Sequence, residues 1–424
     1  MPPRPTGLSR HPDFLKFWAG QTISLFGSNI TYLALPLTAI LLLDATPGQM
    51  GILTALEFAP FLLFGLLAGA WVDRLPRRPI LIATNVGSAL LVASIPIAAL
   101  AGVLRIEQLY VVGFLAGTCK VLFDVAYMAF LTFLVGREHL VEGNSKMETT
   151  SSIAQITGPG LAGALIEALT APVAIAADAL SFLVSALTLS TIRAEEPVPP
   201  PRDKSRSILG DIKEGLAIVA RNPFLRAIAG AACTSNIFDG ILSAVYLLYI
   251  TEELGVASVW IGIIFGVGSV GGLLASLVGQ RAVRRFGLGT VIIAGMVLGG
   301  ASLLLLPLAG TLPLGGVVVL LLALQWLRGF GIITYNINAI SLRQGITPDA
   351  LQGRVNATGR VIAFSSLPIG ALIGGALGGR IGLEPTVVIA AAGSLLSVLW
   401  LLFSPIRFLR EQPPPLAWME GQVS

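Results

Sequence analysis

The chain has 424 residues, of which 54% are hydrophobic and only 12% are charged, and its mean hydropathy is +0.84. Soluble globular proteins carry about twice that share of charged residues. The composition therefore excludes a soluble enzyme, a nucleic-acid-binding protein and a disordered chain. Cys119 and Cys233 lie in apolar runs, and His11 and His139 lie outside them, so we expect no disulfide framework and no metal site.

Apolar stretches of roughly 20 residues follow one another along the chain, and each is long enough to cross a bilayer. Such segments form helices, because lipid offers no hydrogen-bond partner to backbone N–H and C=O groups. The sequence predicts an all-α membrane protein with twelve transmembrane helices. These spans are expected at 17–43, 49–72, 79–101, 108–135, 144–166, 173–192, 225–250, 259–280, 289–308, 314–340, 356–379 and 384–403.

Most of the basic residues lie on one side of the predicted membrane. Of the 27 lysines and arginines, 22 lie on the side of the N-terminus, and only Arg105 and Arg380 lie in the opposite loops. Lys120, Arg328 and Arg360 fall within spans. The positive-inside rule then predicts that both termini are cytoplasmic, in agreement with an even number of spans. The net charge of +4 therefore reports topology rather than an anionic partner.

One long connection, 193–224, divides the chain into six plus six spans. We expect an N-terminal bundle at 1–192, a cytoplasmic linker at 193–224, and a C-terminal bundle with a short cytoplasmic tail at 225–424. The linker begins Pro-rich and continues with apolar residues at helical spacing, at Ile208, Ile212, Leu216 and Val219. This spacing predicts an amphipathic helix on the inner membrane surface, with a solvated linker helix as the alternative.

The two halves resemble each other at an offset of about 210 residues, as expected for a duplicated six-span unit. GAWVDR at 69–74 aligns with GQRAVR at 279–284, and Pro159 and Gly163 align with Pro368 and Gly374. Such a duplication predicts a substrate site near the membrane midplane between the halves, with alternating access by rocking of one half against the other.

These motifs resemble those of the major facilitator superfamily. GAWVDRLPRRP is similar to the signature loop of the superfamily, and GPGLAG to the Gly-Pro motif of its antiporters. LFDVAYMAFLTFLV, DALSFLVSAL, ILGDIKEGLAIVARNPFLR and TPDALQGRV resemble the branch that contains the enterobactin exporter and macrolide efflux proteins. The chain departs from the family pattern at Pro76, where Gly is usual, and at Val283, where Asp is common.

Four charged residues lie near the middle of predicted spans: Lys120, Asp124, Asp239 and Arg328. A charge at that depth costs about 2.5–3.5 kcal/mol or more, and it usually faces a cavity or a partner. The resemblance implies that spans one, four, seven and ten line a central cavity, and these spans carry all four charges. We expect Asp239 and Asp124 to be the proton carriers.

Each charge also has a structural interpretation. Lys120 and Asp124 share a helical face and would form an ion pair. Asp239 has no oppositely charged residue nearby in its own span. It is therefore expected either to pair with Arg328 or to be protonated at rest. Glu57 in span two is also expected to take part in proton coupling, either as a gate residue or as a cation-recognition group. For Asp178 in span six we expect helix packing.

Aromatic and amide side chains in the cavity-lining spans are the expected substrate contacts. Such groups around a few charges suit bulky amphiphilic drugs or siderophores, although each aromatic residue alone is also explained by packing. The residues are Asn29, Tyr32, Phe123, Tyr127, Asn236, Phe238, Tyr246, Gln325, Trp326 and Tyr335.

The signature loop, with Gly69, Asp73 and Arg74, implies a cytoplasmic latch. The resemblance implies that Asp73 ties the first half to the start of span eleven, where Arg354 and Arg360 lie. Pseudo-symmetry predicts a second pair between the halves, formed by Arg284 and Glu148.

Arg77, Arg78 and Arg285 are expected to be arginines that only mark the cytoplasmic side and have no partner. Gly158 and Pro159 in span five either limit leak, as the antiporter motif implies, or form a packing kink.

The sequence thus predicts a secondary active transporter of the cell (inner) membrane that exports small amphiphilic molecules by proton antiport. None of the five lysines follows a glycine, so no phosphate-binding loop is present and the proton gradient is the expected energy source, with no cofactor. The expected partners are a small-molecule substrate, protons and the bilayer, with a monomeric chain and no nucleic acid. A lipid or lysophospholipid flippase is the alternative, and a membrane receptor or enzyme a remote one.

Overall fold

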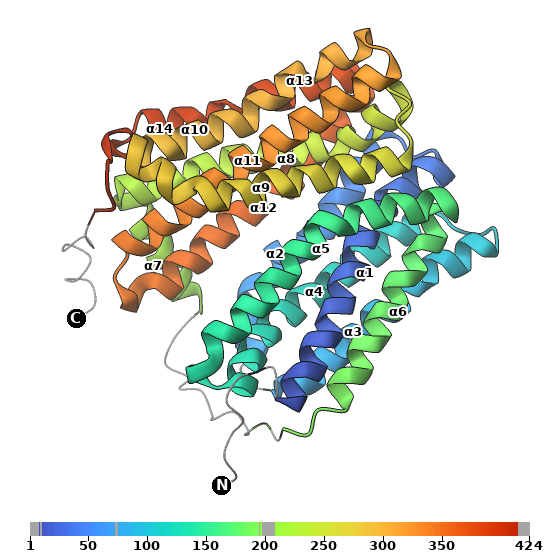
Figure 1. Cartoon of the computed structure of the whole chain (residues 1–424), viewed down its shortest axis with the longest axis horizontal. Coiled ribbons are helices and arrows are strands. Elements are labelled where there is room, and N and C mark those ends of the chain that lie inside the picture. Colours follow the sequence, from blue (N-terminus) through green and yellow to red (C-terminus); the bar gives the residue numbers. More distant parts are fainter. Residues whose placement is uncertain (1–7, 9–10, 73–74, 195, 197–207, 414–424) are drawn as a thin grey trace. The chain divides into compact units, whose positions relative to one another are not determined.

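The structure is a computed structural model that describes residues 8, 11–72, 75–194, 196 and 208–413. Over these residues the chain is helical and has no strand (Figure 1). It forms two compact units. Unit 1 comprises Met1–Ala45, Ala59–Arg202 and Ala257–Gly266; unit 2 comprises Thr46–Phe58, Asp203–Val256 and Val267–Ser424. The boundary therefore crosses two long helices as well as the linker.

Unit 1 is built around a pair of closely packed helices, α1 and α6. Its helices are α1 (Pro12–Leu43), the later part of α2 (Pro47–Val72), α3 (Arg77–Leu100), α4 (Ile106–Val135), the short η2 (Arg137–His139), α5 (Leu140–Ala168) and α6 (Ala171–Ser190). Helix α1 packs against α6 and α5, and α3 packs against α4 and α6. A methyl group added at Gly20 would lie 2.0 Å from the Thr188 hydroxyl oxygen, so this glycine permits the close contact of α1 with α6.

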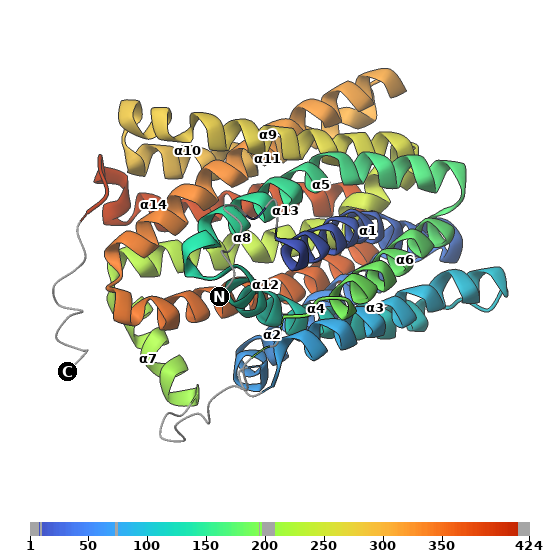
Figure 2. The same cartoon turned by 60° about the horizontal axis from the view of Figure 1, so that its bottom comes forward.

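Unit 2 is centred on α8, which packs against α12, α13 and α14 (Figure 2). Its elements are the first part of α2, α7 (Ile208–Arg221), α8 (Pro223–Leu248), the π-helical turn η3 (Tyr249–Glu253), the later part of α9 (Ser258–Phe286), α10 (Leu288–Ala301), the 3₁₀ segment η4 (Ser302–Thr311), α11 (Leu314–Ile346), α12 (Asp349–Ile381), α13 (Leu383–Ser394), α14 (Leu396–Leu402) and η5 (Pro405–Phe408). A methyl group at Gly370 of α12 would lie 1.9 Å from the carbonyl oxygen of Ile237 in α8. Helix α8 thus touches the backbone of α12 directly.

Eleven helices in the described part of the chain are long and apolar enough to cross a membrane, judged by length and composition. The expected span at 144–166 is the exception. It lies in α5, a helix of 29 residues that does not reach the hydropathy required of a membrane-spanning helix. The first half of α5 carries the charged residues Glu142, Lys146 and Glu148. The count of twelve spans therefore stays a prediction.

Two of the expected spans are not continuous α-helices. Span nine consists of α10 followed by η4, which contains Pro307. Proline has no N–H group and its ring obstructs the preceding turn, so it disfavours regular helix there. Span twelve is interrupted at Leu395, between α13 and α14. The hydropathy pattern located both segments but could not show these breaks.

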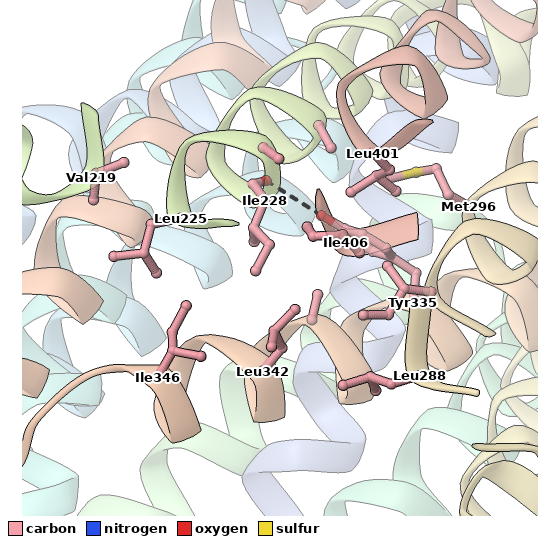
Figure 3. Close-up of a cluster of buried hydrophobic side chains, with 14 of the residues drawn as sticks. Val219, Leu225, Ile228, Leu288, Met296, Tyr335, Leu342, Ile346, Leu401 and Ile406 are labelled. Carbon is pink, nitrogen blue, oxygen red and sulfur yellow. Dashed lines mark hydrogen bonds between the residues drawn. The ribbon is translucent and has the colours of Figure 1, made fainter. Parts of the chain in front are cut away.

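The linker helix α7 is present where the spacing of apolar residues predicted it. Its apolar residues pack against other helices of the protein rather than facing the membrane surface or solvent. Helix α7 packs against α12 and α8. Ile218 and Val219 are buried in a cluster with residues of α8, α10, α11 and η5 (Figure 3), whereas Leu216 is exposed. In the same cluster the Tyr335 hydroxyl donates to the Ile228 carbonyl oxygen at 3.5 Å. Helix α7 is therefore part of unit 2, because its apolar residues have a protein surface to bury against.

Candidate functional site

Unit 2 contains a cavity of about 360 Å³, lined by residues of α8, α10, η4, α11, α12 and α13 and by Val219 of α7. This volume lies within the range of about 300–1,000 Å³ that is usual for small-molecule sites. The cavity borders the buried cluster of Figure 3, since Leu225, Ile228, Met296 and Tyr335 belong to both. All the described residues that line it belong to unit 2, and most of them lie on membrane-spanning helices.

An ion pair between α8 and α11 lies at this cavity. The Arg328 Nη2 group donates to the Asp239 Oδ1 atom at 2.5 Å, and the Ser235 hydroxyl donates to Oδ2 at 3.3 Å. The side chains of Arg328 and Asp239 are 21% and 29% exposed. The sequence left two alternatives open for Asp239, and the structure shows the one in which Asp239 forms an ion pair with Arg328.

Three further predicted substrate contacts line the same cavity. Asn236 donates through Nδ2 to the Ala363 carbonyl oxygen of α12 at 2.8 Å, and Tyr335 makes the contact with Ile228 described above. Phe238 packs against α13, where a methyl group at Gly393 would lie 1.9 Å from its ring. These side chains connect helices at the cavity wall as well as facing the cavity.

Sequence reasoning missed other lining residues, among them Ser235, Met296, Arg343 and Phe364. Ser235 precedes Asp239 by four residues and so shares its helical face, which is a signal that the sequence did contain. Arg343 was counted only as a topological arginine. The apolar residues of α10 and α12 carry no comparable signal, because nothing in a hydrophobic run distinguishes a cavity wall from a lipid-facing side.

Three charged side chains are among the described residues that line the cavity. Among the described residues that line it, the charged ones are Asp239, Arg328 and Arg343. Electrostatic interactions are stronger here than in bulk water, because the surrounding helices lower the local dielectric constant. At this wall the opposite charges of Asp239 and Arg328 balance each other.

The second predicted charge pair lies in unit 1, on α4. Lys120 Nζ is 3.1 Å from Asp124 Oδ2, and the two side chains are 64% and 45% exposed. The aromatic residues beside it form a stack: the rings of Phe123 and Tyr127 are 6.0 Å apart, and those of Tyr127 and Phe17 are 5.6 Å apart. Phe123 and Tyr127 are thus partly buried and pack against the core of unit 1, whereas the ion pair is more exposed.

The other predicted contacts are distributed over several helices. Asn29 of α1 donates to its own helix at the Leu25 carbonyl oxygen, 2.8 Å away, and Tyr32 is exposed. Trp326 stacks on Phe330 with a ring separation of 5.7 Å. Gln325 and Tyr246 are buried. None of these five predicted residues is among the described residues that line the cavity.

Two acidic residues lie in other spans. Glu57 is half-buried in α2 and has no hydrogen-bond or ion-pair partner among the described residues. Asp178 of α6 is fully buried and accepts a hydrogen bond from the Ser181 hydroxyl at 3.0 Å. It also lies against Gly27 of α1, where an added methyl group would be 2.6 Å from its Oδ1 atom. This position agrees with the packing role expected for Asp178.

The latch residues are only partly described. Asp73 and Arg74 lie outside the described residues, as does the side chain of Arg360. Arg354 binds Glu214 of α7. Further latch and motif residues lie on α2, α5 and α9: Gly69, Glu148, Gly158, Pro159 and Arg284.

The Gly-Pro motif of α5 is a point of close helix contact in unit 1. A methyl group at Gly158 would lie 2.6 Å from the Asn29 Cβ atom of α1. The carbonyl oxygen of Pro159 lies 2.2 Å from the position of a methyl group added at Gly262, at the start of α9. Small residues are thus required on both sides of this contact.

Arg77 and Arg78 have partners, so the expectation that they lack them is wrong. Glu196 accepts hydrogen bonds from the backbone N–H groups of both, at 2.7 and 3.1 Å, and from the Arg77 guanidinium at 3.1 Å. Arg78 donates to the carbonyl oxygens of Leu189 and Ser190 at the end of α6. A carboxylate at the start of α3 and an arginine at the end of α6 both complement the helix dipoles.

Comparison with known proteins places this architecture in a family. The family model of the Major Facilitator Superfamily matches residues 17–357 and 228–417. The multidrug efflux pump Tap of Mycolicibacterium fortuitum is 28% identical over 413 residues, which cover 94% of this chain and 97% of the relative. The macrolide efflux protein A of Streptococcus pyogenes is 25% identical, over 88% of this chain and 90% of its own. The enterobactin exporter EntS of Escherichia coli O157:H7 is 23% identical, over 98% and 97%.

Solved structures show the same fold. A bacterial homologue of the iron transporter ferroportin, in an inward-facing state, matches with a TM-score of 0.76 at 18% identity, over 94% of this chain and 99% of that one. The nucleoside transporter NupG, as its D323A mutant, matches with a TM-score of 0.72 at 13% identity, over 92% and 99%. At these identities the likeness concerns the fold alone.

Proposed function

The chain belongs to the major facilitator superfamily, and from this membership we propose that it exports small amphiphilic molecules by proton antiport. It is a multi-pass transporter of the cell (inner) membrane rather than an enzyme, and it falls in the branch of the drug, macrolide and enterobactin exporters. These relatives are named for the export of drugs, macrolides and a siderophore, and we extend that class of cargo to this chain.

The observation that carries the proposal is the ion pair of Asp239 and Arg328 inside membrane-spanning helices. Charges at this depth cost about 2.5–3.5 kcal/mol or more, so they are retained where they serve ion or substrate movement. A proton on Asp239 cancels its charge and removes the main attraction for Arg328. Protonation therefore changes what the cavity binds, which is the requirement for coupling a proton to cargo.

The remaining sequence predictions complete the proposal. Twelve spans form two six-span halves that give alternating access, with both termini cytoplasmic and a monomeric chain. The proton gradient is the energy source, and Asp124 and Glu57 are further proton-coupling residues. The Gly158-Pro159 contact limits leak by holding α5 close to its neighbours.

The test is proton movement driven by cargo in proteoliposomes that hold a trapped pH-sensitive dye. A macrolide, enterobactin and lysophosphatidylcholine are added in turn to the purified full chain. We expect a macrolide or enterobactin to start a proton flux, and Asp239→Asn to abolish it. Asp44→Asn is the matched control, because Asp44 is exposed and has a positive φ of 47° at the end of α1, which asparagine also adopts.

Two results would contradict the proposal. Wild-type coupling in both Asp239→Asn and Asp124→Asn would remove these residues as proton carriers. A flux with lysophosphatidylcholine and with neither other compound would replace drug export by the lipid transport that the sequence left as its alternative.

A further inference from the structure

We propose that a surface patch of arginines and phenylalanines on unit 2 binds the headgroup of an anionic phospholipid. The arginine–phenylalanine patch lies at the end of α9 and in and just after η5, and it consists of Arg284, Arg285, Phe286, Arg407, Phe408 and Arg410. The inference rests on the proposed function in one respect, since the proposed topology puts the patch at the cytoplasmic surface of the membrane. It depends neither on the cargo nor on the coupling ion.

Backbone hydrogen bonds hold the two parts of the patch side by side. After α9, the Leu288 N–H group donates to the Arg410 carbonyl oxygen at 3.1 Å, and the Gly289 N–H group donates to the Leu409 carbonyl oxygen at 2.8 Å. Leu288 and Ile406 are buried in the cluster of Figure 3, which anchors both segments from within unit 2. The fold therefore brings together arginines that are far apart in the sequence.

Two guanidinium groups of the patch lie over phenylalanine rings. The Arg407 Cζ atom is 4.4 Å from the centre of the Phe408 ring, and the Arg285 Cζ atom is 5.6 Å from the centre of the Phe286 ring. Such cation–π contacts orient a guanidinium group without neutralising its charge. Arg285, which was expected only to mark the cytoplasmic side, thus belongs to an ordered arrangement of charge and ring.

The patch carries a surplus of positive charge. Its four arginines are exposed, and none of them has an ion-pair partner among the described residues. Glu411, which follows Arg410, is the exposed acidic neighbour. A guanidinium group presents its N–H donors in a planar fork that matches two oxygens of a phosphate. Clusters of arginines beside membrane-spanning helices attract anionic lipid headgroups in this way.

The exposed rings favour a lipid over a soluble anion. Phe286 and Phe408 are 61% and 72% exposed, and Phe403, just after α14, is 83% exposed. All three lie at or just beyond the end of a membrane-spanning helix, where the bilayer meets water. Apolar rings at this depth contact the boundary between headgroups and acyl chains. A soluble anion would use the arginines but would gain nothing from the rings.

The experiment is native mass spectrometry of the purified full chain, titrated with dioleoylphosphatidylglycerol or with dioleoylphosphatidylcholine. The two lipids have the same acyl chains and differ in headgroup charge. One arginine near an anionic lipid contributes about fivefold in affinity, so we expect phosphatidylglycerol to bind at least about tenfold more tightly. A higher concentration of ammonium acetate should narrow this difference, because salt screens exposed charges.

Charge-matched variants separate the patch from the general positive charge of the surface. Arg285→Gln with Arg407→Gln should lower the affinity for phosphatidylglycerol about tenfold or more and leave that for phosphatidylcholine unchanged. Arg193→Gln with Arg221→Gln is the matched control. It removes two exposed arginines from the same predicted side of the membrane but outside the patch, so it should bind both lipids like the wild type.

Two further measurements test the part played by the rings. Phe286→Ser with Phe408→Ser should weaken the binding of both lipids, because contact with the acyl chains is lost. Glycerophosphoglycerol is the same headgroup without acyl chains. Added at the concentration of the lipid, it should fail to displace phosphatidylglycerol from the wild type.

Three outcomes would overturn the inference. Equal affinity for the two lipids would remove the anionic site. An equal loss in the control pair and in Arg285→Gln with Arg407→Gln would spread the binding over the whole charged surface. Displacement by glycerophosphoglycerol would replace the lipid by a soluble phosphodiester. Failure of the proposed export is a separate result, because lipid binding is measured without cargo and without a proton gradient.

Discussion

A single methyl group added at Gly370 should disturb the cavity without touching its charges. Gly370 lies in α12, and an added Cβ atom would be 1.9 Å from the carbonyl oxygen of Ile237, two residues before Asp239 in α8. Carbon and oxygen atoms need about 3.2 Å, so the two backbones must separate by about 1 Å. Overpacking of this kind costs about 1–3 kcal/mol. We expect Gly370→Ala to lower the thermal unfolding midpoint in detergent and to weaken cargo-driven proton flux.

Gly379→Ala is the matched control in the same helix. No atom lies within 4 Å of the position where its methyl group would be. Alanine has the higher helix propensity, by about 1 kcal/mol, so this variant should be unchanged or slightly more stable. If Gly370→Ala and Gly379→Ala unfold at the same temperature, α8 and α12 are not in the direct backbone contact on which the reasoning depends.

Three further variants test other contacts. Ser235→Ala removes one hydrogen bond to Asp239, so proton-coupled flux should fall about two- to tenfold, less than in Asp239→Asn. Glu196→Gln weakens three hydrogen bonds at the start of α3 and should cost about 1 kcal/mol in thermal unfolding, whereas Glu167→Gln, on an exposed face, should not. Ile218→Asp buries a charge beneath α7 and should increase tryptic cleavage at Arg221; unchanged cleavage would contradict the docking of α7.

Much of the candidate site was predictable from single residues. An aspartate and an arginine in apolar spans are conspicuous, because lipid makes unpaired charges costly. Asp239 and Arg328 were found in this way, and so was the pair of Lys120 and Asp124. Phe238 and Tyr335 were predicted only because they are aromatic residues of the same spans. The same argument predicted Trp326, which stacks on Phe330 and is not among the described residues that line the cavity.

Other features had no signal in the sequence. Glu196 lies near the start of the linker, and only folding brings it to the start of α3, 119 positions away. Helix α7 was expected at the membrane surface or in solvent, because its amphipathic pattern does not state what covers the apolar face. Arg343 lies at the end of a span like many topological arginines, yet it lines the cavity.

The sequence by itself determined the class of the protein, the positions of the membrane-spanning helices and the residues whose burial is costly. Those properties depend on local composition, since hydrophobic length and intramembrane charge act through the bilayer whatever the neighbours are. Only the tertiary structure decided that Asp239 meets Arg328, that the cavity beside them is lined by residues of unit 2, and that Val219 of α7 is one of these residues. Pairing between helices depends on packing over long sequence distances, where glycine contacts such as Gly370 with Ile237 set which faces meet.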